Sequence, residues 1–135
     1  MSAASWAMQK AVYAALRADD GVKAELGDPP RIFDNPPKGE AYPHVVIGEG
    51  RVTPLDGVDG AAEHEIRLQI FSRHAGRREI RRIIDALYDA LHEATFTVDG
   101  HRLVNIRFVF ADIFKRGESD LYQGAARFRA VTQAL

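Results

Sequence analysis

This sequence of 135 residues contains no cysteine and a single tryptophan, Trp6. The absence of cysteine excludes disulfide bonds and thiolate metal sites, and it fits an intracellular, reducing origin. No run of about eighteen apolar residues occurs, so we expect no membrane-spanning segment and no membrane partner. Positive and negative charges nearly balance, with a formal net charge of −1. That balance argues against a protein held on nucleic acid by its overall charge, although it leaves room for a local basic patch.

Residue types that carry catalysis are present, but without the spacing that an active site or a metal site requires. The five histidines occupy positions 44, 64, 74, 92 and 101, and they match no H-E-x-x-H or related ligand pattern. We expect them to be exposed or half-buried. Ser72 stands outside any G-x-S-x-G motif, so its expected role is to cap the turn into the following helix. The sequence therefore predicts no catalytic residue, no metal ion and no cofactor.

The clearest pattern lies in Glu63–Ala94, where a strand leads directly into a helix. Glu63–Arg73 alternates between apolar and polar residues, which is typical of a strand with one buried face. After Gly76 the apolar residues recur at helical spacing instead. They are Ile80, Ile83, Ile84, Leu87 and Leu91. We expect this helix to pack its apolar side on the sheet.

The remaining segments complete an expected single domain, residues 1–135. Residues 1–26 are predicted to form N-terminal helices, and residues 27–62 to form loops and a first strand at His44–Gly48. Within that middle part, Gly50–Ala62 contains three glycines and is predicted to be a long, mobile loop. Residues 63–135 hold the strand and helix described above, followed by C-terminal strands.

The C-terminal part is predicted to contain a short strand at Thr95–Val98 and a type I′ turn at Asp99-Gly100. A long strand, Arg102–Phe114, and a closing strand, Leu121–Ala134, follow. The long strand is expected to bury one row of side chains, namely Val104, Ile106, Phe108 and Phe110. The predicted fold class is α+β, a mostly antiparallel sheet of about five strands with helices packed on one face, including one strand–helix–strand crossover.

Four arginines fall on the polar side of the predicted strands: Arg67, Arg107, Arg127 and Arg129. An antiparallel sheet commonly has one solvated face, so these side chains are compatible with plain solvent exposure. Arginine is also enriched at protein interfaces, so a contact with another chain is an equal alternative. A surface beside DNA is a third interpretation.

The order of these segments resembles one family, the tail terminator or tail-completion proteins of long-tailed bacteriophages and phage-derived gene transfer agents. The resemblance starts with Arg31-Ile32 and the apolar strand led by Tyr42-Pro43. It continues with Phe71-Ser72 at the end of the next strand and with the helix spacing from Gly76 to Leu91. The final two strands, joined by a charged turn, also match. The family often has tryptophan where Phe71 stands.

The resemblance implies structural work without a catalytic residue or cofactor. It implies a hexameric ring that caps the tail tube, contacts the tail tube protein and a head-side connector or stopper protein, and lets DNA pass through its lumen without sequence-specific binding. The location implied is the host cytoplasm during assembly and then the tail–head junction. We expect ring contacts on the polar sheet face, with the four arginines meeting acidic groups of the next subunit. Those acidic groups are Glu63, Glu65 and Asp120.

Two other function classes stay open. One is a small enzyme or ligand-binding module with a pocket under the proline-rich loop, using Tyr42 and His44. A deep pocket around a histidine with a strongly shifted pKa would favour it. The other is a nucleic-acid-binding domain that uses the arginine face, for which salt-sensitive DNA binding would be the sign.

Overall fold

The computed structural model describes residues 2–36, 38–48, 50–73, 76–117 and 120–135. His74, one of the five histidines, lies outside these ranges. The helices are α1 (Ser2–Ala18), α2 (Asp20–Leu26) and α3 (Gly76–Leu91). The strands are β1 (Ile32–Phe33), β2 (His44–Ile47), β3 (Arg51–Pro54), β4 (Ala61–Ser72), β5 (His101–Lys115) and β6 (Tyr122–Ala134).

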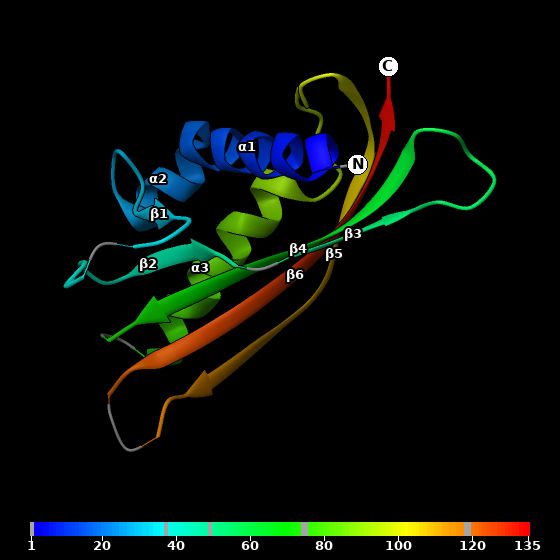
Figure 1. Ribbon diagram of the computed structural model, residues 1–135. Helices are drawn as coiled ribbons and strands as arrows, with labels where there is room; N and C mark the ends of the chain where they lie inside the picture. Colours follow the sequence, from blue (N-terminus) through cyan, green and yellow to red (C-terminus); the bar gives the residue numbers. More distant parts are fainter. Residues whose placement is uncertain (1, 37, 49, 74–75, 118–119) are drawn as a thin grey trace.

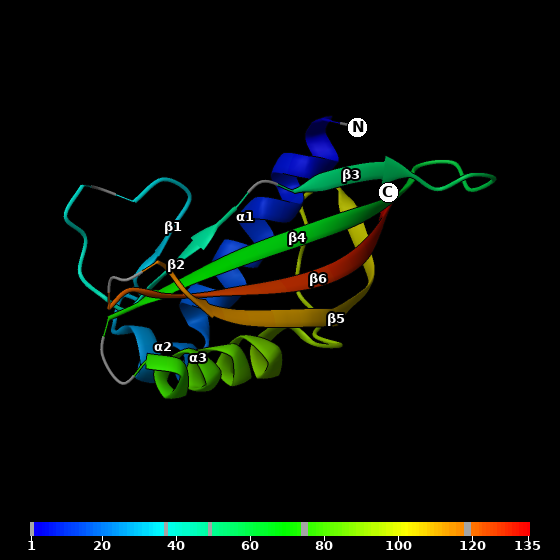
Figure 2. The same ribbon diagram turned by 90° about the horizontal axis from the view of Figure 1, so that it is seen from below.

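The strands form a single six-stranded sheet with the order β1-β2-β4-β6-β5, and β3 pairs with β4 beyond the end of β2. Every pairing is antiparallel except the short parallel pair of β1 and β2. The helices cover one face of this sheet (Figures 1 and 2). The α+β class predicted from the sequence is therefore confirmed, with six strands where about five were expected.

The predicted crossover runs from β4 through α3 to β5. Both β4 and β5 pair antiparallel with β6, so they run in the same direction. They are not neighbours, because β6 lies between them. The long central pairs of the sheet, β4 with β6 and β6 with β5, are the rigid frame from which the outward-facing side chains project.

The core forms between α3 and the sheet as the helical spacing predicts. Ile80, Ile83, Leu87 and Leu91 have no exposed surface. Gly124 of β6 lies directly beneath the helix, since a Cβ atom there would come within 2.7 Å of Ile80 Cγ2. The glycine thus lets α3 approach the sheet closely, which is a common reason for glycine inside a strand.

The long strand β5 departs from the predicted alternation. Its register against β6 shifts between Leu103 and Asn105 and again between Phe108 and Phe110. Each shift inserts one extra residue, a β-bulge, and moves the following residues to the opposite face. Ile106 and Phe108 face the core as expected, but Val104 and Phe110 do not join it and are exposed. The predicted single row of four buried side chains is wrong for this reason.

The segment before β5 also differs from expectation. Thr95–Val98 is not a strand, and only Val98 makes an isolated bridge, to His101. The turn at Asp99-Gly100 exists, with His101 N donating to Val98 O at 3.0 Å, but only Gly100 has a positive φ, of 71°. It is therefore not the predicted type I′ turn, which needs positive φ at both central positions.

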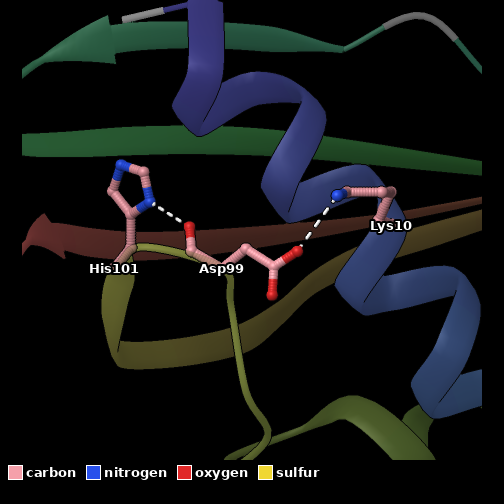
Figure 3. A network of polar contacts seen from close by, with 3 residues as sticks. All are labelled: Lys10, Asp99 and His101. Carbon is pink, nitrogen blue, oxygen red and sulfur yellow. Dashed lines mark hydrogen bonds and ion pairs between the residues drawn. The ribbon is translucent and has the colours of Figure 1, made fainter.

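Asp99 connects this turn to the N-terminal helix (Figure 3). Lys10 Nζ of α1 lies 3.0 Å from Asp99 Oδ2. His101 Nδ1 lies 2.7 Å from the Asp99 backbone carbonyl. A carbonyl only accepts, so this nitrogen is the donor and carries the hydrogen. Both side chains of the ion pair are largely exposed, so the contact orients the turn more than it stabilises the fold.

The segment predicted as a mobile loop, Gly50–Ala62, contains a strand. Its first residues form β3, which pairs with β4, and the chain turns back at residues 55–60. We call this β3–β4 hairpin the arm, because it projects from the body of the molecule (Figure 1). No helix in the described part of the chain is long and apolar enough to cross a membrane.

Candidate interaction surface

The outer face is the side of the sheet that the helices leave uncovered. Outward residues alternate with buried residues along β4 and β6, so the polar positions of the sequence come together here. The outer face is formed by Glu63, Glu65, Arg67 and Gln69 of β4, Ala125, Arg127 and Arg129 of β6, and Arg107, Phe110 and Phe114 of β5. Of the seven residues proposed from the sequence for the ring contacts, all except Asp120 share this face.

Glu65 is the central acidic group of the outer face. Its Oε1 atom lies 2.8 Å from Arg67 Nε and 3.2 Å from Arg127 Nε. Arg67 and Arg127 are direct cross-strand partners, so two like charges stand opposite each other and one carboxylate oxygen lies between them. Like charges in this position are destabilising unless something neutralises them. Glu65 therefore serves both arginines as a shared counter-ion.

The charges around Glu65 change its acidity. The hydrogen bond from Arg67 holds the pKa of the Glu65 carboxyl below its ordinary value of 4.5, and the positive charges of Arg67, Arg127 and Arg51 add to the effect. The carboxylate stays ionised at neutral pH as a result. It supplies a permanent negative centre among cations, which suits a structural role better than proton transfer.

The other predicted arginines are also ion-paired within the chain. Arg129 Nη2 lies 2.7 Å from Glu63 Oε2, and Arg107 Nη2 lies 3.4 Å from Glu93 Oε1. Asp120 lies apart from this face, in the connection between β5 and β6, where its Oδ1 is 3.2 Å from Arg73 Nη1. The acidic groups expected to meet a neighbouring subunit thus have partners in their own chain.

These pairs leave the guanidinium groups accessible. The four arginine side chains keep between 38% and 57% of their surface exposed, and each guanidinium has five N–H donors. A carboxylate that binds one or two donors leaves the others free for a partner. The face can therefore make polar contacts with another chain. Its net positive charge is small, because Glu63, Glu65 and Glu93 offset most of the charge of the four arginines.

Apolar side chains at the β5 side of the outer face were not foreseen from the sequence. Phe110 reaches this face because of the second bulge, and the Arg127 guanidinium carbon lies 4.8 Å from the centre of its ring. Phe114 faces the same way, opposite Gln123. No local sequence pattern marks the bulge, because the extra residue is visible only in the register against β6.

An open hollow of about 530 Å³ lies beside Tyr42 and His44, as the ligand-binding alternative requires, but the His44 ring is held in aromatic packing. The His44 ring is buried and lies 5.0 Å from the Tyr42 ring and 5.2 Å from the Phe71 ring. Its Nδ1 atom lies 3.0 Å from the Ala41 carbonyl and must donate to it. The guanidinium carbon of Arg73 lies 4.8 Å from the centre of the Tyr42 ring. His44 is therefore a packing residue at the β2 end of the sheet, and it is buried where an exposed or half-buried side chain was expected.

His64 is the other histidine whose predicted exposure is wrong. It lies on the helix-covered side of β4 with 2% of its surface exposed, and its Nε2 is 2.8 Å from Thr132 Oγ1. Burial lowers the pKa of His64 below 6.5, and the nearby charge of His101 lowers it further. Within the described ranges, no group of three or more histidine and acidic side chains is placed to hold a metal ion.

Comparison with known proteins concerns the chain as a whole. A chain in the solved structure titled "Virion of native gene transfer agent (GTA) particle" is similar to this chain with a TM-score of 0.87 and 27% sequence identity. The similarity covers 97% of this chain and 98% of that chain. A separate comparison with curated proteins finds no match. The family model described as "Tail completion protein gp17" matches residues 10–133, so the chain belongs to this family of virion tail proteins.

Proposed function

We propose that this protein is a tail terminator, a non-enzymatic ring protein that caps the finished tail tube and joins it to the head-side connector or stopper protein. The observation that carries the proposal is the similarity over nearly the whole of both chains to a component of a gene transfer agent virion. The family match over residues 10–133 supports it independently. The ring is hexameric in this proposal, and DNA passes through its lumen without sequence-specific contacts.

The structure supports a role in assembly through the outer face. Arg67, Arg107, Arg127 and Arg129 are held in place by Glu63, Glu65 and Glu93 but keep free donors. Side chains already oriented by neighbours lose little entropy when a partner binds. We assign this face, together with Asp120 at the β5–β6 connection, to contacts with neighbouring chains at the tail end.

The size of the chain bears on when the ring forms. A protein of 15.0 kDa offers each neighbour a limited surface, and stable interfaces bury about 1,600 Å² in total. We therefore expect a monomer in dilute solution and a closed ring where the tail tube end holds several copies together. The protein assembles in the host cytoplasm and then occupies the tail–head junction.

The test is the position and effect of the protein in assembled particles. A preparation made without the protein should contain separate heads and tails. Supplying the wild-type protein should restore their joining. Electron microscopy of restored particles should place a six-fold density of this protein between tube and connector. Normal joining in its absence, or a position elsewhere in the particle, would overturn the proposal.

A further inference from the structure

The free edge of the sheet at β5 is divided into two parts. Its first part is covered by the chain that follows α3, because Glu93 N donates to Ile106 O at 2.7 Å and Phe108 N donates to His92 Nδ1 at 3.0 Å. Beyond this point, in the part of the chain that the structure describes, Val109–Lys115 has no strand other than β6 beside it. An uncovered strand edge of this kind is a ready site for a second chain.

Exposed apolar side chains gather on this uncovered part of β5. Val109 is 51% exposed, Phe110 38% and Phe114 42%. Soluble proteins rarely leave several large apolar side chains together without a partner. We call Val109, Phe110 and Phe114 the β5 ridge. Asp112 stands in the same outward row, between the two phenylalanines.

An apolar hollow lies at the opposite edge of the sheet, between α1 and β1. It has a volume of about 440 Å³, and its lining includes Trp6, Tyr13, Ile32, Phe33 and Ile47. Trp6 is 60% exposed. Lys10 and Asn35 lie at the same hollow. A large exposed tryptophan beside a hollow is the kind of site where interface energy concentrates.

The ridge and the hollow lie at the same level of the sheet. Phe33 pairs with Val46, Val46 with Gln69, Gln69 with Ala125 and Ala125 with Asp112. This row of paired residues across the sheet begins at the hollow and ends at Asp112, which lies between Phe110 and Phe114. In addition, β1 runs opposite to β5, since β1 is parallel to β2 and β2 is antiparallel to β4. Two different, complementary patches on opposite edges are the requirement for a head-to-tail contact.

We propose that the β5 ridge of one copy packs into the α1–β1 hollow of the next copy. The proposal rests on the ring of the proposed function and assigns the contact that builds it. A closed ring has no rise from copy to copy, so patches at equal height on opposite edges meet when the ring axis runs along the strands. The hollow carries both Lys10, which also pairs with Asp99, and Asp34, so charge does not select the pairing with Asp112, and the equal height of the two apolar patches carries the proposal.

Cysteine cross-linking tests the contact cleanly because the natural chain has no cysteine. We would combine Val109→Cys with Asn35→Cys, both at exposed positions, and oxidise particles that contain this variant. A non-reducing gel should show a ladder of multimers. Each single variant should stay monomeric, because in a head-to-tail contact position 109 never meets position 109. A matched control combines Val109→Cys with Asp85→Cys, which lies on the exposed side of α3 and should give no ladder.

The outcomes separate this contact from the proposed function. Six-fold density at the tail end together with monomers on the gel would overturn the contact and leave the terminator assignment in place. A dimer from the Val109→Cys single variant would also overturn it, because that result requires a symmetric contact. Absence of the wild-type protein from the tail end would overturn both. If only the double variant fails to enter particles, the purified variant is oxidised at rising concentration, where a ladder supports the contact and monomers alone overturn it.

Discussion

Arg67 and Arg127 face each other across neighbouring strands and share one oxygen of Glu65. The two guanidinium groups lie so close together that they would repel each other if the carboxylate were absent. It also explains why an arginine-rich face exists on a chain with a net charge of −1. The arginines are held by acidic residues of the same chain and remain partly exposed, so the face is polar and ordered before any partner arrives.

Glu65→Gln should make stability depend on salt. Without the carboxylate, Arg67 and Arg127 repel each other, and added salt screens that repulsion. The cost at low salt should be about 1 kcal/mol or less, because all three side chains are partly exposed. Urea unfolding at low and high salt measures the effect, with Asp85→Asn on α3 as a control. An equal salt response in both variants would contradict the shared counter-ion.

Reversing two charges on the outer face should reduce tail–head joining. If the proposed interface holds, Arg127→Glu with Arg129→Glu places negative charges opposite the acidic groups of a neighbouring chain, and like charges across a contact repel. The double reversal also leaves Glu63 and Glu65 without their partners, so Arg127→Gln with Arg129→Gln is the milder companion variant. Complementation of particles lacking the protein, scored as joined particles, gives the result. Normal joining by both folded variants would exclude the arginine face from assembly.

Leu87→Ala should destabilise the protein by about 2–5 kcal/mol, from lost burial and the cavity left behind. Leu87 of α3 has no exposed surface and lies in the core between this helix and the sheet. Asp89→Ala, on the exposed side of the same helix, should cost little. Urea melts of the two variants provide the comparison, and similar costs would mean that α3 does not anchor the core.

Hydrogen exchange should divide the arm into two parts. In the free subunit the amides of β3 that bond to β4 should be protected, while residues 55–60 at the tip should exchange quickly. In the assembled ring the tip should become protected, because Val58 at the tip is exposed and available to a neighbour. Exchange at the tip that stays the same on assembly would show that the arm takes no part in it.

Stability should fall as the pH drops below about 6.5. Burial keeps the pKa of His64 below 6.5 in the folded state, so the unfolded chain takes up the proton first and unfolding is favoured. The loss should end once the pH falls below the folded-state pKa of His64. His64→Gln should lose less stability than the wild type between pH 7.5 and pH 5, as read from urea midpoints. Parallel curves for the two proteins would assign the pH dependence to other groups.

The sequence alone determined β4, α3 and the fold class. Apolar residues alternate along β4 and recur every three or four residues along α3, and a buried face requires those local periods. The same alternation placed Arg67, Arg127 and Arg129 on one face. The order of motifs from Tyr42 to Leu91 was enough to indicate the family that the comparisons confirm.

Only the tertiary structure decided the register of β5 and the partners of the arginines. It also decided that the β5 ridge and the α1–β1 hollow lie at the same height of the sheet. A bulge is defined by the strand opposite it, so nothing near Val104 or Val109 in the sequence reveals that Phe110 turns outward. The ion pairs follow from side chains brought together across strands, and Glu93 reaches Arg107 from the end of α3. The burial of His64 depends on Thr132, which is 68 residues away in the chain but 2.8 Å away in space. Such contacts depend on how distant segments meet, which local sequence patterns do not encode.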